Sequence, residues 1–427
     1  MFADSHPAKQ HQKSPSEVQM RICIFTDSFL PYCSGGTFAG LNQALELSRR
    51  GHEVYIFRPR VWGDSKREVL PKAIKVHDSP FSLPVPHVPK LYITIPSFWS
   101  VGRKLLAIKP DVIHVNTEWG CGWEALMGAK WLGIPSVGTF HTFYADPGYL
   151  QAFRLPNHAV VQRLMWRYSL FIFSQCNTVI SPSEAVRNAL IARGLRSKPV
   201  LISNGMRPVS LRPHEEIVAL RAEYQLHGPT FVYVGRISLE KSLDILLRAF
   251  QHVVAHLPEA RLVLIGDGPY GPKLNEIIGQ LRLTSQVVQH GYVPHHDLLS
   301  TNLPRLGDVF VTASKTENQP LSIMEAMAFG LPVVGVNARG MPELVADGVN
   351  GLLCRPDDPV DIACGMMRLV DDEALRHQMS QAAIAAVANH AITHTVNKLE
   401  QTYRLTIRRF KRCLSTRLAV PDKSDVP

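Results

Sequence analysis

The chain has 427 residues, 45% of them hydrophobic, and this length favours two or three domains with large cores. No run of 18 apolar residues occurs, so we expect no membrane-spanning helix. The excess of 46 Lys and Arg over 36 Asp and Glu favours an anionic partner, namely a nucleotide, a nucleic acid or an acidic membrane, and no nucleic-acid motif supports the second of these.

The start of the chain and the pattern of its cysteines both favour a cytosolic location. Residues 1–20 lack the apolar core of a secretion signal, so we predict a disordered leader in a protein that is not secreted. The 7 cysteines are scattered without any C-x-x-C pair. This pattern favours reduced thiols in the cytosol and indicates neither a disulfide framework nor a zinc site.

The sequence after the leader predicts a βαβ unit. Strands over 21–27 and 52–58 flank a helix that ends at Gly51. The loop before this helix contains Gly35 and Gly36, which would allow the backbone to approach a phosphate. A plain turn explains the glycine pair equally well.

The chain then continues the same domain. Five prolines in residues 79–96 exclude a central strand or a helix interior. An amphipathic helix over 98–109 fits core packing or contact with a membrane. Strands over 110–115 and 135–140 follow, with a helix between them. His141 comes directly after the second strand, at the end where a doubly wound sheet meets its ligand, and this position favours a functional role over a structural one.

The segment after this histidine mixes aromatic and cationic residues. We predict a helix that bears Arg154, Arg163 and Arg167. Core packing with a solvated face explains the mixture, and so does a surface for an acceptor or a membrane. On the second reading, Tyr144, Tyr149 and Arg154 are the candidate acceptor contacts.

A second series of alternating strands and helices begins at residue 231. Strands over 177–181 and 200–203 close the first series, and 207–228 provides a linker and a helix. Two such series predict an α/β fold with two Rossmann-like domains and parallel sheets that face a cleft. The predicted boundaries are 21–206 for the first domain, 207–395 for the second, and 396–427 for a final helix and basic tail.

Two motifs at strand ends of the second domain suggest a nucleotide. Arg236 and Lys241 lie at its mouth and would suit a diphosphate, although alone they could be solvated charges. In the loop Gly266, Asp267 and Gly268, small residues would let a planar ring lie against the backbone. This loop lacks the third glycine of a dinucleotide fingerprint, which disfavours a nicotinamide dehydrogenase.

Residues 316–332 are the segment that we expect to contribute most to a catalytic site. A strand over 308–312 leads through a polar turn into a helix, with Glu317 before the turn and Glu325 in the first turns of the helix. Backbone N–H groups over 319–322 would lie unpaired at the helix N-terminus, where the dipole favours an anion. Both carboxylates could therefore face one ligand.

The last predicted helix, from residue 396 to 418, is basic and amphipathic. Apolar residues interleave with its cations, so it can lie on an anionic bilayer, each cation adding about 1 kcal/mol. Packing back on the first domain is an equal alternative. The cations are Arg404, Arg408, Arg409, Lys411, Arg412 and Arg417.

Taken together, the motifs closely resemble the retaining glycosyltransferases of family four, which have the GT-B architecture with the active site between two Rossmann-like domains. The likeness covers residues 21–404. The motifs that carry it are Gly35-Gly36, residues 49–54, His141, Gly235-Arg236, Glu240-Lys241, residues 266–269, Glu317 with Glu325, and residues 340–343.

The resemblance implies a role for each site residue. Arg236 and Lys241 would neutralise the donor diphosphate, Glu325 would hold the ribose and Glu317 the donor sugar, while His141 would touch that sugar near the reacting carbon. Catalysis would therefore depend on His141, Glu317, Arg236 and Lys241. Further donor contacts implied are Gly35, Gly36, Gly266, Asp267, Gly268, Asn318, Gln319, Pro320 and Leu321.

The chemistry fits these groups. Cleavage of the sugar–phosphate bond builds negative charge on the diphosphate, which fixed cations and a helix N-terminus stabilise. No D-x-D triplet occurs, so we expect no metal and no cofactor beyond the donor itself. The family further implies attack on the face that the leaving group departs from, with a phosphate oxygen helping to deprotonate the acceptor.

Polar Asn318 and Gln319 replace the Gly-Phe of many relatives. In this, and in His141-Thr142 followed by tyrosines, the chain is similar to enzymes that glycosylate diacylglycerol. We therefore expect transfer of a hexose or hexuronic acid from a UDP-sugar to a diacylglycerol-type lipid, by a cytoplasmic protein peripheral to the inner face of the cell membrane. The alternatives are a soluble sugar or a polysaccharide or lipopolysaccharide precursor as acceptor, and a nucleotide-sugar-binding protein without turnover.

Overall fold

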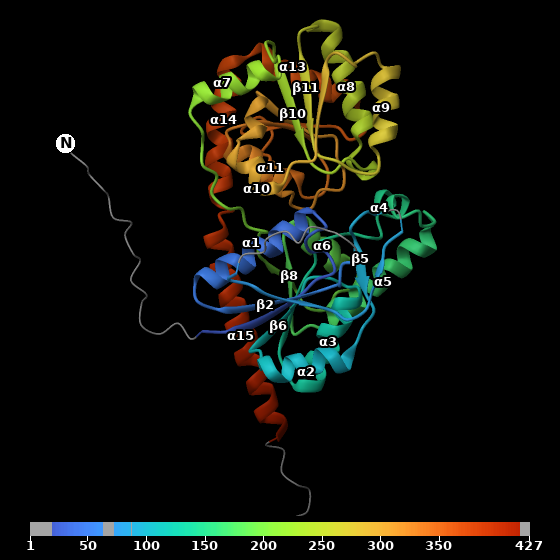
Figure 1. The fold of residues 1–427 in the computed structure, drawn as a ribbon, viewed down its shortest axis with the longest axis vertical. Helices are drawn as coiled ribbons and strands as arrows, with labels where there is room; N and C mark the ends of the chain where they lie inside the picture. The colour runs from blue at the N-terminus through green and yellow to red at the C-terminus, as the bar shows by residue number, and fades with distance from the viewer. Residues whose placement is uncertain (1–18, 63–71, 87, 419–427) are drawn as a thin grey trace, which may run out of the picture.

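The computed structural model describes residues 19–62, 72–86 and 88–418. Figure 1 shows two α/β domains stacked along the long axis, the first in blue to green and the second in yellow-green through orange to red. The predicted leader lies outside the described residues as far as residue 18. Met20, its last residue, is 3% exposed and packs in the core of the first domain, so Met20 belongs to this domain and not to the leader.

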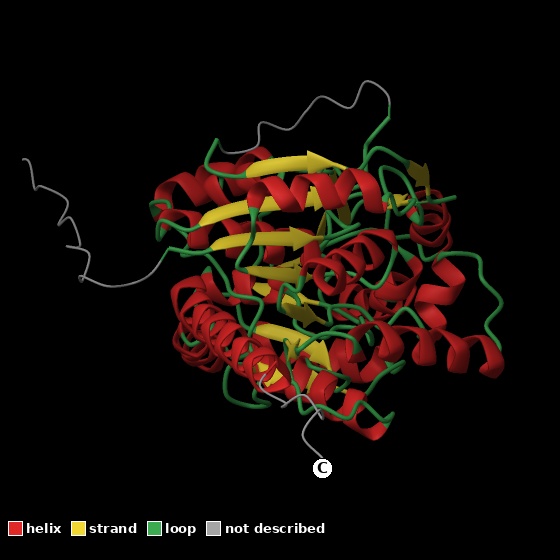
Figure 2. Cartoon of the chain, turned by 90° about the horizontal axis from the view of Figure 1, so that it is seen from below, coloured by secondary structure: helices red, strands yellow, loops and turns green. Residues whose placement is uncertain are grey.

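Within the described residues, the first domain contains a parallel sheet of seven strands in the order β3-β2-β1-β6-β7-β8-β9. Figure 2 shows strands of this sheet as arrows that point the same way. In the centre, Ile22 of β1 lies opposite Val54 of β2 and Val112 of β6. The strands are β1 Arg21–Phe25, β2 Glu53–Arg58, β3 Lys75–Asp78, β6 Val112–Val115, β7 Ser136–Thr139, β8 Thr178–Ser181 and β9 Val200–Leu201.

Helices cover both faces of this sheet, which explains its nearly continuous apolar strands. They are α1 Gly35–Arg49, α2 Phe98–Ile108, α3 Gly120–Leu132, α4 Pro147–Ala152, α5 Ala159–Ser174, α6 Glu184–Ala192 and, from the end of the chain, α15 Ile392–Leu418. Cys23 and Phe25 of β1 pack in a core with α2, α3 and α5. Ile22 and Ile24 pack in the opposite core with α1 and α15.

Three local features differ from the prediction or add to it. The edge strand β3 was not predicted, because its side chains are mostly polar and partly exposed. The proline-rich segment forms an antiparallel pair, β4 (Ser82–Pro84) with β5 (Tyr92–Thr94), outside the main sheet. The helix predicted to bear Arg154 is wrong at that residue, because the chain turns there between α4 and α5 with φ of 55°.

The second domain repeats the architecture with six parallel strands among the described residues, in the order β12-β11-β10-β13-β14-β15. Its strands are β10 Thr230–Val234, β11 Arg261–Ile265, β12 Val287–Gly291, β13 Val309–Val311, β14 Val333–Val336 and β15 Gly351–Cys354. Its helices are α7 His214–Glu223, α8 Leu243–His256, α9 Gly271–Gln280, α10 His295–Ser300, α11 Leu321–Ala328, α12 Met341–Leu344, α13 Pro359–Asp371 and α14 Glu373–Ala388, with 3-10 turns η1 Leu239–Lys241 and η2 Leu303–Leu306.

The final helix α15 crosses back from the second domain to the first (Figure 1). Tyr403 is fully buried, and its hydroxyl is 2.6 Å from His114 Nδ1. Glu400 Oε1 is 2.7 Å from His52 Nε2. The half of α15 up to Ile407 therefore packs on the first domain, as one of the two alternatives proposed. The next turn, beginning at Arg408, leaves its cations exposed.

Candidate active site

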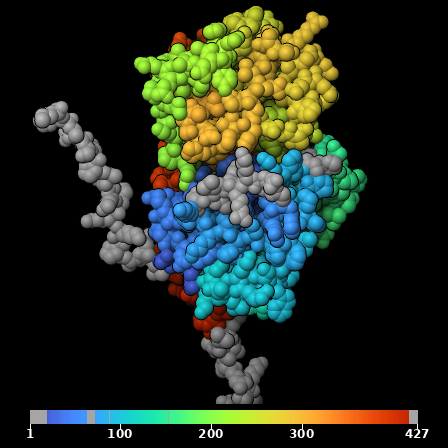
Figure 3. Space-filling model, viewed as in Figure 1, coloured from blue at the N-terminus to red at the C-terminus, as the bar shows by residue number. Residues whose placement is uncertain are grey.

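A cleft of about 750 Å³ lies between the two domains and is lined by residues of both. In Figure 3 the boundary between the blue first domain and the orange second domain crosses the molecule. The parallel strands of both sheets end at this cleft. His141 comes after β7, Arg236 after β10 and Gly266 after β11, and all three line it. The carboxyl ends of the two sheets thus face each other.

Arg236 and Lys241, the two cations singled out from the sequence, both line the second-domain wall. Arg236 donates to Glu240 Oε1 at 2.5 Å and, across the cleft, to the Tyr32 hydroxyl at 2.7 Å. Lys241 Nζ is 2.6 Å from Glu317 Oε1. Burial acts to lower the pKa of both cations, but these neighbouring oxygens raise each pKa above its usual value. Both groups are therefore positively charged at neutral pH.

Glu317 and Glu325 lie on either side of the turn that enters α11. Glu325, in the second turn of the helix, is 4% exposed, and its Oε1 is 2.6 Å from His295 Nε2 of α10. Leu321 and Ser322 line the cleft at the start of α11, where backbone N–H groups have no acceptor within the helix. Two carboxylates, two cations and a helix N-terminus thus share one wall.

The loop after β11 requires glycine. Gly266 has φ of 144°, and a Cβ added there would lie 1.9 Å from the carbonyl oxygen of Gly235. A Cβ on Gly268 would lie 2.2 Å from the carbonyl oxygen of Ile237. Gly266, Asp267 and Gly268 all line the cleft, so the backbone here is open to a ligand.

The facing wall belongs to the first domain. Helix α1 begins at Gly35, and the Ser34 side chain caps it by accepting from the Thr37 N–H at 3.2 Å. A Cβ on Gly36 would lie 3.9 Å from the His141 side chain, so the two residues are neighbours. Burial lowers the pKa of His141 to about 4, so its imidazole is neutral at pH 7.

Asn318 and Gln319 line the cleft, but their side chains also connect the domains. Asn318 Nδ2 donates to the His141 carbonyl at 2.8 Å. Gln319 Oε1 accepts from the Asn204 N–H at 2.6 Å and from the Ser203 hydroxyl at 3.1 Å. These two polar residues therefore hold the loop before α11 against the first domain, which the sequence did not predict.

Of the candidate acceptor residues, Tyr144 and Tyr149 line the cleft together with Phe153. The ring of Tyr144 lies edge-on to Tyr149 at 5.9 Å and to Phe153 at 6.0 Å between centroids. Arg154 is not among the lining residues and is exposed on the turn between α4 and α5. The structure thus brings the two tyrosines, but not Arg154, to the cleft.

Three residues that sequence reasoning missed also line the cleft. Tyr32 bonds to Arg236, and His295, which bonds to Glu325, stacks on Phe38 with centroids 4.1 Å apart. Tyr32 lies in the turn at the end of β1, a position that could have identified it. Nothing in the sequence around His295 or Phe38 marks either residue.

In residues 19–62, 72–86 and 88–418, no three His, Cys, Asp or Glu side chains gather where they could hold a metal ion. Across the same described segments, no helix is both long and apolar enough to cross a membrane.

Comparison with protein families gives two matches that follow the two domains. Residues 39–208 match the family described as Glycosyltransferase Family 4. Residues 221–386 match the family described as Glycosyl transferases group 1. Each match covers most of one Rossmann-like unit.

Among curated proteins, the chain is similar to an alpha-monoglucosyldiacylglycerol synthase of Acholeplasma laidlawii, with 28% identity over 78% of this chain and 84% of that protein. It is also similar to a sulfoquinovosyl transferase of Arabidopsis thaliana, with 30% identity over 71% of this chain and 58% of that protein. A GDP-mannose-dependent alpha-mannosyltransferase of Mycolicibacterium smegmatis is 28% identical over 79% of this chain and 85% of its own length.

Solved structures share the fold. An Anabaena protein, HepE, in complex with UDP-glucose matches with a TM-score of 0.74 and 21% identity, over 90% of this chain and 99% of that one. Sucrose-phosphate synthase from Thermosynechococcus elongatus matches with a TM-score of 0.73 and 19% identity, over 92% and 100%. The chain therefore belongs to the glycosyltransferases of family four and has the GT-B architecture.

Proposed function

We propose that this glycosyltransferase moves a hexose or hexuronic acid from a UDP-sugar to a diacylglycerol-type lipid at the inner face of the cell membrane. The donor part of the proposal depends on the charge of the cleft. Arg236 and Lys241 and the N-terminus of α11 would neutralise the diphosphate as it leaves. Glu325 would hold the ribose and Glu317 the sugar.

Across the cleft, His141 would lie beside the reacting carbon. Because burial lowers the pKa of His141 to about 4, the ring stays neutral and does not repel the positive charge that develops on the sugar. The bond that forms joins the acceptor oxygen to the anomeric carbon on the face from which the diphosphate departs. A phosphate oxygen would take the hydroxyl proton. Arg236 and Lys241 would neutralise the departing diphosphate in place of a metal ion.

The observation that carries the lipid acceptor is a set of exposed apolar side chains on the segment that follows the cleft lining. Tyr149 and Phe153 line the cleft, and the chain then exposes Leu155. On α5, which follows, Leu164 and Phe171 are 58% and 50% exposed. Such side chains each gain about 1.5–3 kcal/mol when fully buried in an apolar phase.

Exposed cations lie on two helices. Arg163 and Arg167 are on the same helix as Leu164 and Phe171, and Arg408 and Arg409 are near the end of α15. Each cation near an anionic lipid surface contributes about 1 kcal/mol. The relatives named as alpha-monoglucosyldiacylglycerol synthases support the same acceptor class.

The test supplies radiolabelled UDP-glucose, UDP-galactose, UDP-glucuronic acid and GDP-mannose to the enzyme with two competing acceptors, a water-soluble sugar and anionic vesicles that contain diacylglycerol. GDP-mannose is included because the mycobacterial mannosyltransferase is as similar as the Acholeplasma synthase. We expect label from a UDP-sugar in the organic phase. Label that enters only soluble acceptors would overturn the lipid assignment, and label from GDP-mannose alone would overturn the donor assignment.

A matched pair of variants tests the membrane surface. Leu164→Glu introduces a charge into the apolar stripe of α5, whereas Val218→Glu makes the same change on α7 of the second domain at a residue that is 52% exposed. We expect Leu164→Glu alone to weaken vesicle binding at least threefold and to slow transfer to vesicle-bound lipid. Equal binding by both variants would contradict this surface.

A further inference from the structure

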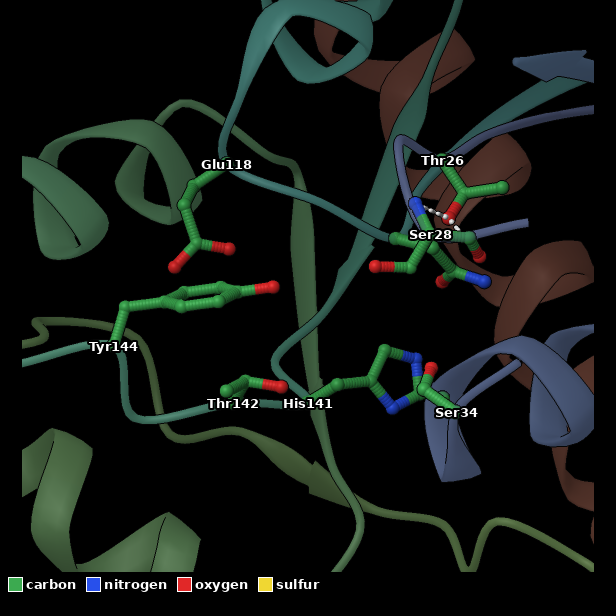
Figure 4. Close-up of a pocket in the computed structure, with 9 residues that line it drawn as sticks. Thr26, Ser28, Ser34, Glu118, His141, Thr142 and Tyr144 are labelled. Atoms are coloured by element: carbon green, nitrogen blue, oxygen red, sulfur yellow. Dashed lines mark hydrogen bonds between the residues drawn. The ribbon is translucent and has the colours of Figure 1, made fainter. Parts of the chain in front are cut away.

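A second, smaller pocket opens from the first-domain side of the cleft beside His141. It has a volume of about 30 Å³, enough for one water-sized group. Ser28, Ser34, His141 and Tyr144 line both this pocket and the large cleft, so the two are continuous. Figure 4 shows the Glu118 carboxylate at the upper side of this space and the His141 ring at its lower side.

The wall of this pocket is rich in acceptors. Glu118, in the loop after β6, is 4% exposed, and its Oε1 accepts a hydrogen bond from the Ser169 hydroxyl at 2.9 Å. Asn116 Oδ1 and His141 Nε2 are buried and have no hydrogen-bond partner within the described part of the chain. Buried polar atoms of this kind are normally satisfied, so a ligand O–H group fits here.

The same wall carries no positive charge. None of the described residues that line the pocket is Lys or Arg. The charged or titratable groups that face Glu118 are Asp27 after β1, His141 and Tyr144 after β7, and Tyr168 of α5. An anionic substituent on a sugar would therefore meet a carboxylate without a compensating cation.

We propose that this pocket binds a hydroxyl of the transferred sugar through Glu118 and Asn116 and thereby selects a neutral hexose over a hexuronic acid or another anionic sugar. This inference deepens the proposed function and depends on its donor site. It does not require that the acceptor be a lipid. Glu118 contacts the donor in this account but takes part in no bond that forms or breaks.

Binding of donors in the absence of acceptor tests the proposal. We expect wild-type enzyme to bind UDP-glucose about tenfold or more tighter than UDP-glucuronic acid, since two like charges in a site shielded from water repel strongly. Glu118→Gln keeps the size and the hydrogen bond from Ser169 but removes the charge. We expect this variant to reduce the preference at least threefold.

The variant Ser169→Ala distinguishes a structural role of Glu118 from a role in donor binding. It removes the hydrogen bond from Ser169 to Glu118, but Ser169 itself does not line the pocket. We expect Ser169→Ala to keep the wild-type preference. If both variants lower donor preference equally, Glu118 acts only through packing and the proposal fails. If Glu118→Gln changes only the KM of the acceptor and leaves UDP-sugar binding intact, the hydroxyl belongs to the acceptor and the donor assignment fails.

The pH dependence of binding gives an independent readout. Burial raises the pKa of Glu118 to about 7. The charged form therefore increases from pH 6 to pH 8, and the preference for UDP-glucose should increase with it in wild-type enzyme. Asp27, whose pKa burial raises to about 6, is retained in Glu118→Gln and serves as the internal reference. An equal pH dependence in wild type and Glu118→Gln would overturn the role of Glu118. Failure of lipid glycosylation would leave these binding results unaffected.

Discussion

Replacement of Lys241 by alanine separates transition-state stabilisation from structural charge pairing. Lys241 Nζ lies 2.6 Å from Glu317 Oε1, and the two side chains are 19% and 13% exposed. If Lys241 stabilises the departing diphosphate, its loss removes one preorganised donor, which typically costs 10²–10³ in kcat, or about 3–4 kcal/mol. The variant also leaves Glu317 without its partner in a mostly buried site, at about 1–3 kcal/mol of folding stability.

The two effects are measured separately, by steady-state transfer kinetics and by urea unfolding. Lys315→Ala is the matched control, because Lys315 Nζ pairs with Asp357 at the same 2.6 Å, but these side chains are 41% and 56% exposed. We expect Lys315→Ala to change stability by about 0–1 kcal/mol and leave kcat unchanged. A Lys241→Ala enzyme that is folded and retains kcat within threefold of wild type would refute the role of Lys241 at the diphosphate.

Three further predictions concern the backbone, the metal and the tail. Gly266→Ala should lower the free energy of unfolding by about 1–3 kcal/mol or more in a urea titration, because its Cβ would lie 1.9 Å from the Gly235 carbonyl. The control Gly271→Ala has open space around its Cβ and should be neutral. Equal stability of the two variants would contradict this. Transfer should be unchanged by EDTA, because fixed cations neutralise the diphosphate, and a loss restored by Mg²⁺ would disprove this. A chain that ends after Ile407 should unfold like wild type but bind anionic vesicles more weakly, and unaltered vesicle binding would show that the exposed end of α15 does not contact lipid.

Strand–turn–helix periodicity predicted much of this fold. Apolar runs buried on both faces, such as β1 and β10, have a strong signal, and the predicted α/β class with two facing domains is confirmed. The edge strand β3 has mostly polar side chains and no alternation of exposed and buried positions, so periodicity does not distinguish it from a loop. The turn at Arg154 depends on a left-handed backbone angle that no glycine or asparagine announces.

The site was predictable where a residue lies directly at a strand end. His141, Arg236 and Gly266 follow this rule, and the structure places all three at one cleft. Glu118, in the loop after β6, satisfies the same rule but was overlooked. The pairing of Glu325 with His295 was beyond sequence reasoning, because it depends on how α10 packs against α11.

The interdomain side-chain bonds also depend on three-dimensional packing. Gln319 lies more than 100 positions along the chain from Asn204, and only the closed arrangement of the domains brings its amide oxygen within 2.6 Å of the Asn204 N–H. Local sequence patterns indicate which residues are buried and where the chain turns, but they do not indicate which loop of one domain contacts which loop of the other. A polar pair in place of Gly-Phe could therefore be noticed in the sequence but not given this role.

The most direct test of the account is a crystal structure of the enzyme with UDP bound. We expect the diphosphate between Arg236, Lys241 and the first amides of α11, with the ribose at Glu325. A nucleotide bound elsewhere, with Arg236 still bonded to Glu240 and Lys241 to Glu317 as in the free enzyme, would contradict the assignment of the donor site.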